Sequence, residues 1–346
     1  MTDEMVRIGF VGAGANTKLR HIPGFRELDG VELVSVANRS RASGQRVADE
    51  HRIATVYDNW QDLIEAGDTN AICIGTWPYT HRTMVLASLD AGKHVMTEAR
   101  MAMNATEAHE MLDASRRKPE LVAQIVPAPM TLKVDATIKD LIADGYLGDI
   151  LSVDIVVHQD GFVDRDGPFH WRHDRELSGY NILQMGIWYE AVMRWIGPAA
   201  SVTAVARVNV PARKDDTGAL RWITVPDHVE VLCEMVSGPV VRMRFSTITG
   251  LAPDDGIWFF GTEGTLRVES AIMTLHGGRR GDDALKEIEI PLEKQGSWRV
   301  EEEFVRAIRG LEPITHTSFE DGVKYMEFTE AVTRSAQTGK KVYLPL

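Results

Sequence analysis

The chain has 346 residues, of which 44% are hydrophobic, so it can bury a sizeable core, and its length favours two domains over one. The formal net charge of −12 argues against a nucleic-acid partner, because phosphate backbones need clustered Lys and Arg. No uncharged apolar run reaches the ~18 residues of a membrane span, and no basic segment followed by an apolar core opens the chain. We therefore expect a cytoplasmic protein without a membrane partner.

The first third of the chain alternates short apolar runs with helical stretches. Strands are predicted over residues 7–11, 32–37, 71–75, 94–97 and 121–126. Helices are predicted over residues 18–28, 40–51, 60–66, 80–91 and 106–117, the last of them capped by Asn104. This alternation is typical of a doubly wound parallel sheet with helices on both faces, the Rossmann type of α/β fold.

The first predicted strand ends at two glycines one residue apart, Gly12 and Gly14. A strand that ends in such a turn before a helix brings bare backbone N–H groups and the positive end of the helix dipole to one point. We expect a pyrophosphate to bind there, with Ala15, Asn16 and Thr17 in the first helical turn. Thr17 stands where the third glycine of a dinucleotide fingerprint would fall, so the motif is partial.

The second predicted strand ends in Asn38, Arg39 and Ser40. A dinucleotide fold usually carries an acid here, which accepts hydrogen bonds from the adenosine ribose. An amide followed by a cation and a hydroxyl suits a 2′-phosphate instead, so NADP(H) is favoured. NAD(H) stays possible because Asn38 can bond both ribose hydroxyls, and Arg39 can also be an ordinary solvent-exposed strand end.

A polar turn that contains a proline follows the strand over residues 71–75. Ligands bind at the carboxyl edge of a parallel sheet, where this turn lies. We therefore expect cofactor contacts here from Thr76, Trp77, Pro78 and His81, with Thr76 and Pro78 on the nicotinamide side. Trp77 can stack on a ring or simply cap the core.

After residue 127 the rhythm changes to long alternating segments. Strands are predicted over residues 149–158, 201–210, 228–237, 240–249, 256–261 and 265–269, and helices over 132–142, 179–195, 297–309 and 319–337. This pattern predicts an α+β domain with a large, open, mostly antiparallel sheet. The domains expected are therefore 1–127 and 128–346. An open sheet must cover its second face, so we expect a homodimer or homotetramer formed through it.

The run Gly92-Lys93-His94-Val95, followed by Glu98, resembles a segment of the glucose-fructose oxidoreductase and inositol dehydrogenase (Gfo/Idh/MocA) family. The glycine turn and residues 76–81, 147–149, 261–266 and 335–342 carry the same resemblance in the same order. The resemblance implies a Rossmann domain and an open-faced second domain. It also implies NAD(P)-linked chemistry at a carbinol of a sugar, sugar acid, polyol or glycoside.

The chain departs from this family at its catalytic motifs. Where the family carries Glu-Lys-Pro, whose lysine reaches the reacting oxygen, this chain reads Glu98-Ala99-Arg100. By the resemblance, Glu98 contacts the cofactor ribose or the substrate, whereas the proton-handling lysine is missing. In the second family motif, Gln184 stands where an acid is expected and Trp188 where a histidine is expected. One extra residue also lies between Gly14 and His21.

The predicted helix 179–195 places Asn181, Gln184 and Trp188 on one face, because they lie three and then four residues apart. Two amides and an indole can orient hydroxyl groups and stack on a sugar ring, so we assign these three side chains to substrate binding. The same face can alternatively pack against the sheet.

The segment 169–174 holds the densest set of ionisable and aromatic side chains. His170 or His173 is the candidate for the relocated acid or base, with Asp174 holding a ring. Arg172 or Arg100 can neutralise a developing alkoxide, and Trp171 is a candidate substrate contact. The alternative is an ordinary surface pair of His173 and Asp174. The histidines show no spacing typical of a metal site, so no metal is expected.

Three functions remain open on these residues. The first is an NAD(P)-dependent oxidoreductase with an altered catalytic set. The second is a redox-neutral enzyme that keeps its cofactor bound and isomerises or eliminates through a transient ketone. The third is a non-catalytic descendant that binds nucleotide or sugar, which the loss of both motif bases favours.

Overall fold

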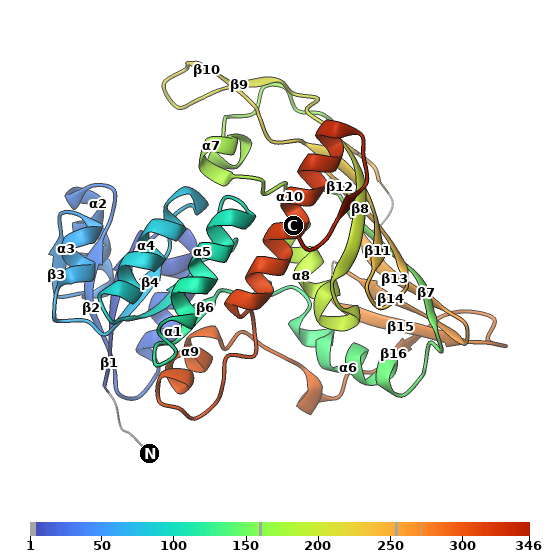
Figure 1. The fold of residues 1–346 in the computed structure, drawn as a ribbon, viewed down its shortest axis with the longest axis horizontal. Coiled ribbons are helices and arrows are strands. Elements are labelled where there is room, and N and C mark those ends of the chain that lie inside the picture. The colour runs from blue at the N-terminus through green and yellow to red at the C-terminus, as the bar shows by residue number, and fades with distance from the viewer. Residues whose placement is uncertain (1–4, 159–160, 253–254, 271) are drawn as a thin grey trace. The chain divides into compact units, whose positions relative to one another are not determined.

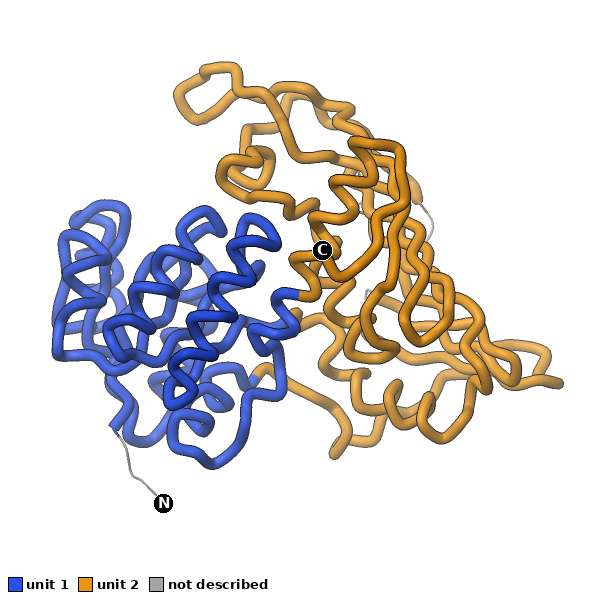
Figure 2. The backbone as a smooth tube through the Cα atoms, in the orientation of Figure 1, with its two compact units in different colours: residues 1–127, 299–323 blue, residues 128–298, 324–346 orange. Residues whose placement is uncertain are grey.

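The computed structural model describes residues 5–158, 161–252, 255–270 and 272–346. The chain divides into two compact units (Figure 2). Unit 1 comprises Met1–Pro127 and Arg299–Val323, and unit 2 comprises Ala128–Trp298 and Lys324–Leu346. The segment 299–323, which we assigned to the second domain from the sequence, thus belongs to the first unit. Its apolar residues explain this, because Phe304 packs edge-to-face on Phe25 with ring centroids 6.3 Å apart.

Unit 1 is built on a six-stranded parallel sheet with the order β3-β2-β1-β4-β5-β6 (Figure 1). Its strands are β1 (Val6–Val11), β2 (Val31–Ala37), β3 (Thr55–Tyr57), β4 (Ala71–Ile74), β5 (His94–Thr97) and β6 (Ala123–Ile125). The chain order reverses between β1 and β4, the point at which doubly wound sheets bind nucleotides. The sequence reading missed β3, whose three residues are too few to show an alternation.

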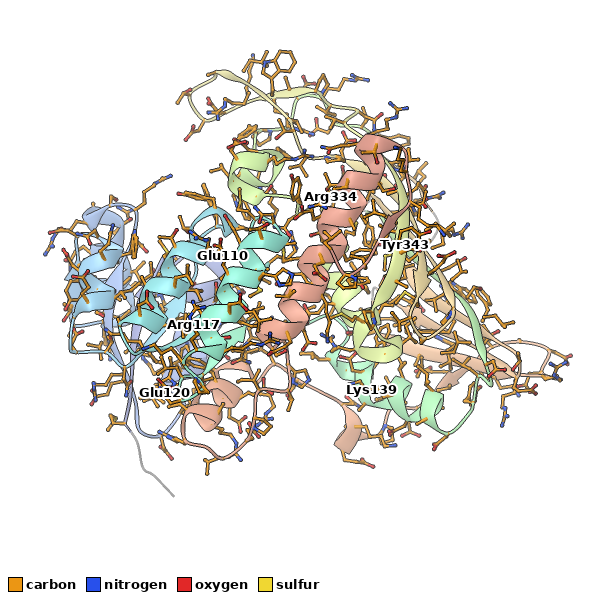
Figure 3. The ribbon with its side chains drawn as sticks, in the orientation of Figure 1. Glu110, Arg117, Glu120, Lys139, Arg334 and Tyr343 are labelled. Carbon is orange, nitrogen blue, oxygen red and sulfur yellow. The ribbon has the colours of Figure 1, made fainter. Side chains whose placement is uncertain are left out.

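The helices of unit 1 are α1 (Ile22–Arg26), α2 (Arg41–His51), α3 (Trp60–Glu65), α4 (Pro78–Asp90), α5 (Ala105–Arg116) and α9 (Val300–Ile308), with a π-helix η1 (Thr17–His21) before α1. The predicted cap of α5 is confirmed, since Asn104 accepts a hydrogen bond of 2.9 Å from the N–H of Glu107. Helices α4 and α5 pack on each other, and an ion pair of Arg82 with Glu110 joins them. Figure 3 labels Glu110 on α5.

Unit 2 is built on a nine-stranded sheet with the order β16-β15-β14-β13-β7-β12-β11-β8-β17. Its strands are β7 (Ile150–His158), β8 (Ala199–Arg207), β11 (His228–Met235), β12 (Val240–Ser246), β13 (Gly256–Gly261), β14 (Gly264–Glu269), β15 (Thr274–Arg279), β16 (Lys286–Ile288) and β17 (Val342–Tyr343). Only the pair β7 and β12 is parallel, so the predicted, mostly antiparallel sheet is confirmed. A separate hairpin consists of β9 (Ala212–Lys214) and β10 (Leu220–Trp222).

Helices cover one face of the large sheet (Figure 1). They are α6 (Leu132–Ala143), α8 (Met185–Ile196) and α10 (Phe319–Thr338). The short helix α7 (Arg175–Ser178) and the 3-10 turns η2 (Trp171–His173) and η3 (Leu292–Lys294) complete the list. Tyr189 of α8 stacks on Phe328 of α10 at 3.6 Å, and Trp195 meets Phe259 of β13 at 5.6 Å. Among the helices described, none is long and apolar enough to cross a membrane.

Candidate active site

The glycine turn of unit 1 is held by the strands on either side of it. The N–H of Gly12 donates to the carbonyl of Ala37 in β2 at 2.8 Å. Gly12 has a φ of +80°, and a Cβ there would lie 3.0 Å from the backbone nitrogen of Thr76, so only glycine fits without strain. Gly14, Ala15 and Asn16 are exposed next to this turn. The turn therefore fits the pyrophosphate of a dinucleotide, which backbone N–H groups at a helix start would bind.

The extra residue after Gly14 is absorbed by the π-helix η1. The N–H of Ile22 donates to the carbonyl of Thr17, five residues earlier, and such a turn holds one residue more than an α-helical turn. Thr17 is 1% exposed. Its side chain therefore packs inside unit 1 instead of facing a phosphate, which corrects its assignment as a cofactor-binding side chain.

The end of β2 supports the turn and exposes one cation. The side-chain oxygen of Asn38 accepts a hydrogen bond of 2.7 Å from the N–H of Ala13, so its amide nitrogen is the part that can donate to a ribose. Ser40 caps α2 by accepting from the N–H of Ser43 at 3.3 Å. Arg39 is exposed between them, directly after β2.

The turn after β4 is only partly available to a ligand. Pro78 is buried in the first turn of α4, and His81 is fully buried. The ring nitrogens of His81 lie 3.1 Å from the carbonyl oxygens of Thr76 and Arg100. Pro78 and His81 therefore shape this turn instead of contacting a cofactor directly, because the strand-to-helix connection packs them inward. Thr76 and Trp77 are half-buried and remain candidates.

Glu98 belongs to a buried charged cluster. The ring of His21 lies between two carboxylates, with Nε2 3.0 Å from Glu98 and Nδ1 2.5 Å from Glu301, and the side chain of Asn16 donates to Glu98. Burial lowers the pKa of His21, but the hydrogen bonds to Glu301 and Glu98 outweigh it and raise the pKa to about 9. Burial by itself would raise the pKa of Glu98, but the hydrogen bond to His21 and the charge of His21 outweigh burial and lower the pKa overall. An imidazolium therefore holds Glu98 as an anion next to the glycine turn.

The peptide bond between Ala99 and Arg100, the two residues expected in place of the family's Lys-Pro, is cis. Arg100 is half-buried, and its carbonyl faces the ring of His81. A guanidinium can stabilise negative charge here but cannot exchange protons near neutral pH.

In unit 2, the two histidines of segment 169–174 cap the 3-10 turn η2. Nδ1 of His173 accepts from the N–H of His170 at 3.0 Å, and Nδ1 of His170 accepts from the N–H of Arg172 at 3.2 Å. Burial, followed by the charge of Arg213, lowers the pKa of His173 to about 4, and burial also lowers the pKa of His170. Both rings are therefore neutral, with one nitrogen each committed to the backbone.

The neighbours of these histidines have partners of their own. The guanidinium of Arg172 lies 4.3 Å from the centroid of the Trp171 ring. Asp174 caps α7 by accepting from the N–H of Glu176 at 2.9 Å, and it lies 3.7 Å from Arg221. The predicted role of Asp174 in holding a histidine ring is therefore wrong, because its carboxylate serves as a helix cap.

The predicted helix 179–195 is also wrong in its first part. Gly179 and Leu183 have positive φ values of 67° and 47°, and α8 begins only at Met185. Asn181 is buried and donates to the carbonyl of Ser178 at 2.6 Å, so it holds the connection instead of sharing a face with Gln184 and Trp188. Those two side chains do meet, since Nε1 of Trp188 donates to Oε1 of Gln184 at 3.3 Å.

Gln184 and Trp188 line a cavity of about 720 Å³ within unit 2. His158 and Asp255 also line it, and none of its described lining residues comes from segment 169–174. This volume suits a small polar organic ligand. The sequence reading missed His158 and Asp255. His158 ends one predicted strand and Asp255 precedes another, but the sequence does not show that these strands pair. The pairing of β7 with β13 in the structure makes the two residues neighbours.

Two family models match the chain in succession. Residues 6–125 match the oxidoreductase family with an NAD-binding Rossmann fold, and residues 136–267 match the GFO/IDH/MocA C-terminal domain. The chain belongs to the GFO/IDH/MocA family of NAD(P)-dependent oxidoreductases. The expected Rossmann domain, the open-sheet domain and the family resemblance are thereby confirmed.

Curated relatives within the GFO/IDH/MocA family are distant. D-glucoside 3-dehydrogenase of Escherichia coli (strain K12) is 24% identical over 99% of both chains. Levoglucosan dehydrogenase of Pseudarthrobacter phenanthrenivorans is 26% identical over 60% of this chain and 57% of its own length. Several other relatives match over less than two thirds of their length. Trans-1,2-dihydrobenzene-1,2-diol dehydrogenase of Bos taurus, for example, is 25% identical over 64% of this chain and 62% of its own length.

Solved structures of the family share the fold at low sequence identity. A levoglucosan dehydrogenase in complex with NADH and L-sorbose has a TM-score of 0.85 at 20% identity, and 98% of this chain and 99% of that chain are covered. An oxidoreductase domain protein from Kribbella flavida has a TM-score of 0.86, also at 20% identity, over 99% and 100% of the two chains. At these identities the likeness shows the fold alone.

Among the described residues, no group of three or more His, Cys, Asp and Glu side chains is arranged to hold a metal ion. The groups available are the glycine turn and Glu98 in unit 1, and the polar and aromatic lining of the cavity in unit 2.

Proposed function

We propose that the protein is an NAD(P)-dependent dehydrogenase or reductase that acts on a carbinol of a sugar, sugar acid, polyol or glycoside. The observation that carries the proposal is the cavity of unit 2, where Gln184 and Trp188 lie together. A carboxamide orients hydroxyl groups, and an indole packs against the apolar face of a sugar ring. The names of the relatives, which act on a D-glucoside, on levoglucosan and on inositol, support this substrate class.

The coenzyme would be held by Gly12, Gly14 and the helix start at Ala15 and Asn16. When bound, it accepts or supplies a hydride. Glu98, kept anionic by His21, would accept a hydrogen bond from a ribose or substrate hydroxyl. The assignment of proton transfer to His170 or His173, with Arg172 or Arg100 neutralising an alkoxide and Trp171 touching substrate, stays a prediction.

The test is a panel assay with purified protein. NADH and NADPH should each be titrated by their fluorescence, and methyl β-D-glucoside, levoglucosan and myo-inositol should be offered with NAD⁺ and NADP⁺. We expect at least one coenzyme to bind and at least one compound to raise the absorbance of reduced nicotinamide. If no coenzyme binds or raises the melting temperature, only a coenzyme-free binding protein remains.

A second candidate is a redox-neutral enzyme with tightly bound NAD(P). It would need an additional base for a C–H proton, and the candidate source is the segment 169–174 with His170 and His173. Such an enzyme would oxidise a carbinol only transiently and isomerise or eliminate next to the ketone. Coenzyme that co-purifies, together with product formation and no net absorbance change, would support this candidate over the first.

For the coenzyme, we propose a preference for NADP(H) based on the exposed Arg39. The change Arg39→Asp should weaken NADPH binding by about tenfold or more, because a charge-assisted contact to the 2′-phosphate becomes a repulsion. NADH, which lacks this phosphate, should lose much less. Arg41→Asp is the control, since Arg41 pairs with Asp58 at 2.8 Å. Equal loss for both coenzymes in the Arg39 variant would remove the assignment.

We also propose a homodimer or homotetramer formed through the uncovered face of the large sheet. That face exposes Val205 by 60% and Leu232 by 51% beside the ion pair of Arg242 with Asp154. Light scattering should give the mass of a dimer or tetramer, and Leu232→Glu should lower it. The control is Leu292→Glu on η3, where the residue is 85% exposed, and this variant should keep the mass of the wild type. A monomeric wild-type protein would contradict the proposal.

A further inference from the structure

The cavity of unit 2 lacks the usual proton acceptor at both positions of the family motif. Gln184 and Trp188 line it, and neither an amide nor an indole takes a proton near neutral pH. Removing a hydride from a carbinol leaves a hydroxyl proton that a base must accept. A base is therefore needed among the other groups that line this cavity.

His158 and Asp255 are such a pair in the same lining. His158 is the last residue of β7, and Asp255 directly precedes β13, which pairs antiparallel with β7 and starts opposite Val156. Nδ1 of His158 lies 3.2 Å from Oδ1 of Asp255, and the backbone N–H of His158 donates to the same oxygen at 2.7 Å. The backbone hydrogen bond thus keeps the carboxylate near the ring, although no hydrogen bond joins the carboxylate to Nδ1.

The position of the carboxylate beside the ring assigns the two side chains their roles. The side chain of His158 is 3% exposed and that of Asp255 is 25% exposed. A carboxylate next to Nδ1 favours the tautomer with the proton on Nδ1, which leaves Nε2 as the neutral acceptor. Nδ1 lies near the carboxylate without a hydrogen bond to it, so Asp255 acts on the ring through its charge, and Nε2 is the nitrogen left for a hydroxyl in the cavity.

We propose that His158 is the general base of the dehydrogenation and that Asp255 is its positioning residue; this rests on the proposed function. In the oxidation, the bound coenzyme would accept the hydride that the breaking C–H bond releases. The O–H bond breaks as Nε2 of His158 takes the proton, and the oxygen's electron pair forms the carbonyl. The products are a ketone, NAD(P)H and a protonated His158, which returns its proton to solvent. Reduction runs the same steps in reverse.

The geometry favours this pair over the histidines of segment 169–174. His170 and His173 use one ring nitrogen each to cap η2, and neither lines the cavity. His158 lines the cavity together with the residues that replace the family's acid and histidine. In this proposal, His158 at the end of β7 takes the role of the histidine that the family motif would place on α8, at Trp188.

The test uses the full-length protein and the panel compound that the wild type turns over fastest. His158→Ala should lower kcat by on the order of 10²–10⁴, and added imidazole should restore part of it, because the variant leaves a space of the same shape. KM and the dissociation constant for NAD(P)H should stay within about threefold. His158→Gln, which fills the space, should be equally slow and should not respond to imidazole. His109→Ala, an exposed histidine of unit 1, should keep the wild-type rate.

Asp255→Asn separates positioning from structure. The amide oxygen can still accept from the N–H of His158, so the connection between β7 and β13 keeps its hydrogen bond. The charge that favours the Nδ1–H tautomer is lost, so we expect a lower kcat with little change in KM. Nitrogen NMR of histidine-labelled wild-type protein should show the Nδ1–H tautomer in the signal that His158→Ala removes. Asp216→Asn, in the exposed turn of the β9–β10 hairpin, is the matched control.

The outcomes divide clearly. A wild-type rate in His158→Ala would overturn the inference and leave the proposed dehydrogenase function standing. The same holds if His170→Asn or His173→Asn loses turnover while His158→Ala keeps it. A slow His158→Ala that imidazole fails to rescue, with unchanged melting temperature, would also count against the base. A wild-type protein that binds NAD(P)H but oxidises or reduces no compound of the panel would remove the proposed function and the inference with it.

Discussion

Replacing Gly12 with alanine should weaken the binding of NADH and NADPH by about tenfold or more, because strain of 1–3 kcal/mol falls on the turn that presents the phosphate donors. The residue has a φ of +80°, and a Cβ would lie 3.0 Å from the backbone nitrogen of Thr76 and 3.2 Å from the carbonyl carbon of Gly75. Backbone atoms of the turn after β4 cannot rotate away as a side chain can. The glycine turn must therefore move, and its N–H groups move with it.

Gly92→Ala is the matched control for this variant. Gly92 also has a positive φ, +71°, but nothing lies within 4 Å of the position of its Cβ. The Gly92→Ala variant should therefore be less stable to unfolding by about 1–2 kcal/mol, because of backbone strain, and should bind the coenzyme as tightly as the wild type. Fluorescence titration gives the affinities, and urea unfolding gives the stabilities. Equal affinities in wild type and Gly12→Ala would mean that the turn does not bind the pyrophosphate.

Unit 1 should lose stability as the pH rises from about 6.5 to 9, the interval between the ordinary pKa of histidine and the raised pKa of His21. The sign follows from proton linkage: below both values the ring is charged in the folded and unfolded states, so the ion pairs with Glu98 and Glu301 stabilise fully. Above the folded value the ring is neutral in both states, and the contribution is gone. Since one pKa unit corresponds to about 1.4 kcal/mol, the loss should be on the order of 3 kcal/mol.

Urea unfolding at intervals between pH 6 and about 10 measures this dependence. In His21→Gln, two buried carboxylates lose their cation, so the variant should be less stable at pH 6.5 by about 3–5 kcal/mol. It should also lack the decline seen in the wild type. His109→Gln, on the exposed side of α5, should decline as the wild type does. A wild-type curve parallel to that of His21→Gln would show that His21 is not charged in the folded protein.

Local patterns were sufficient to predict most elements of the fold. The alternation of strands and helices before residue 127 and the cap Asn104 appear in the structure within a few residues of their predicted places. These features depend on neighbours in the chain: side-chain periodicity, a cap three residues from its donor, and glycine's access to positive φ.

Errors arose where a residue's role depends on distant partners. Asn181 was assigned to a helix face, but Leu183 at a φ of 47° ends that pattern and turns the amide toward Ser178. Thr17, Pro78 and His81 have suitable positions in the motifs, yet tertiary packing buries their side chains. Asp174 lies beside two histidines in sequence but caps α7.

The sequence by itself determined a Rossmann unit followed by an open-sheet unit, and the family. Only the tertiary structure decided which polar side chains meet. His21 contacts Glu301, 280 residues away, and His158 contacts Asp255, 97 residues away. The physical reason is that such contacts follow from strand order and helix packing, which bring distant segments together without leaving a periodic signal in either segment.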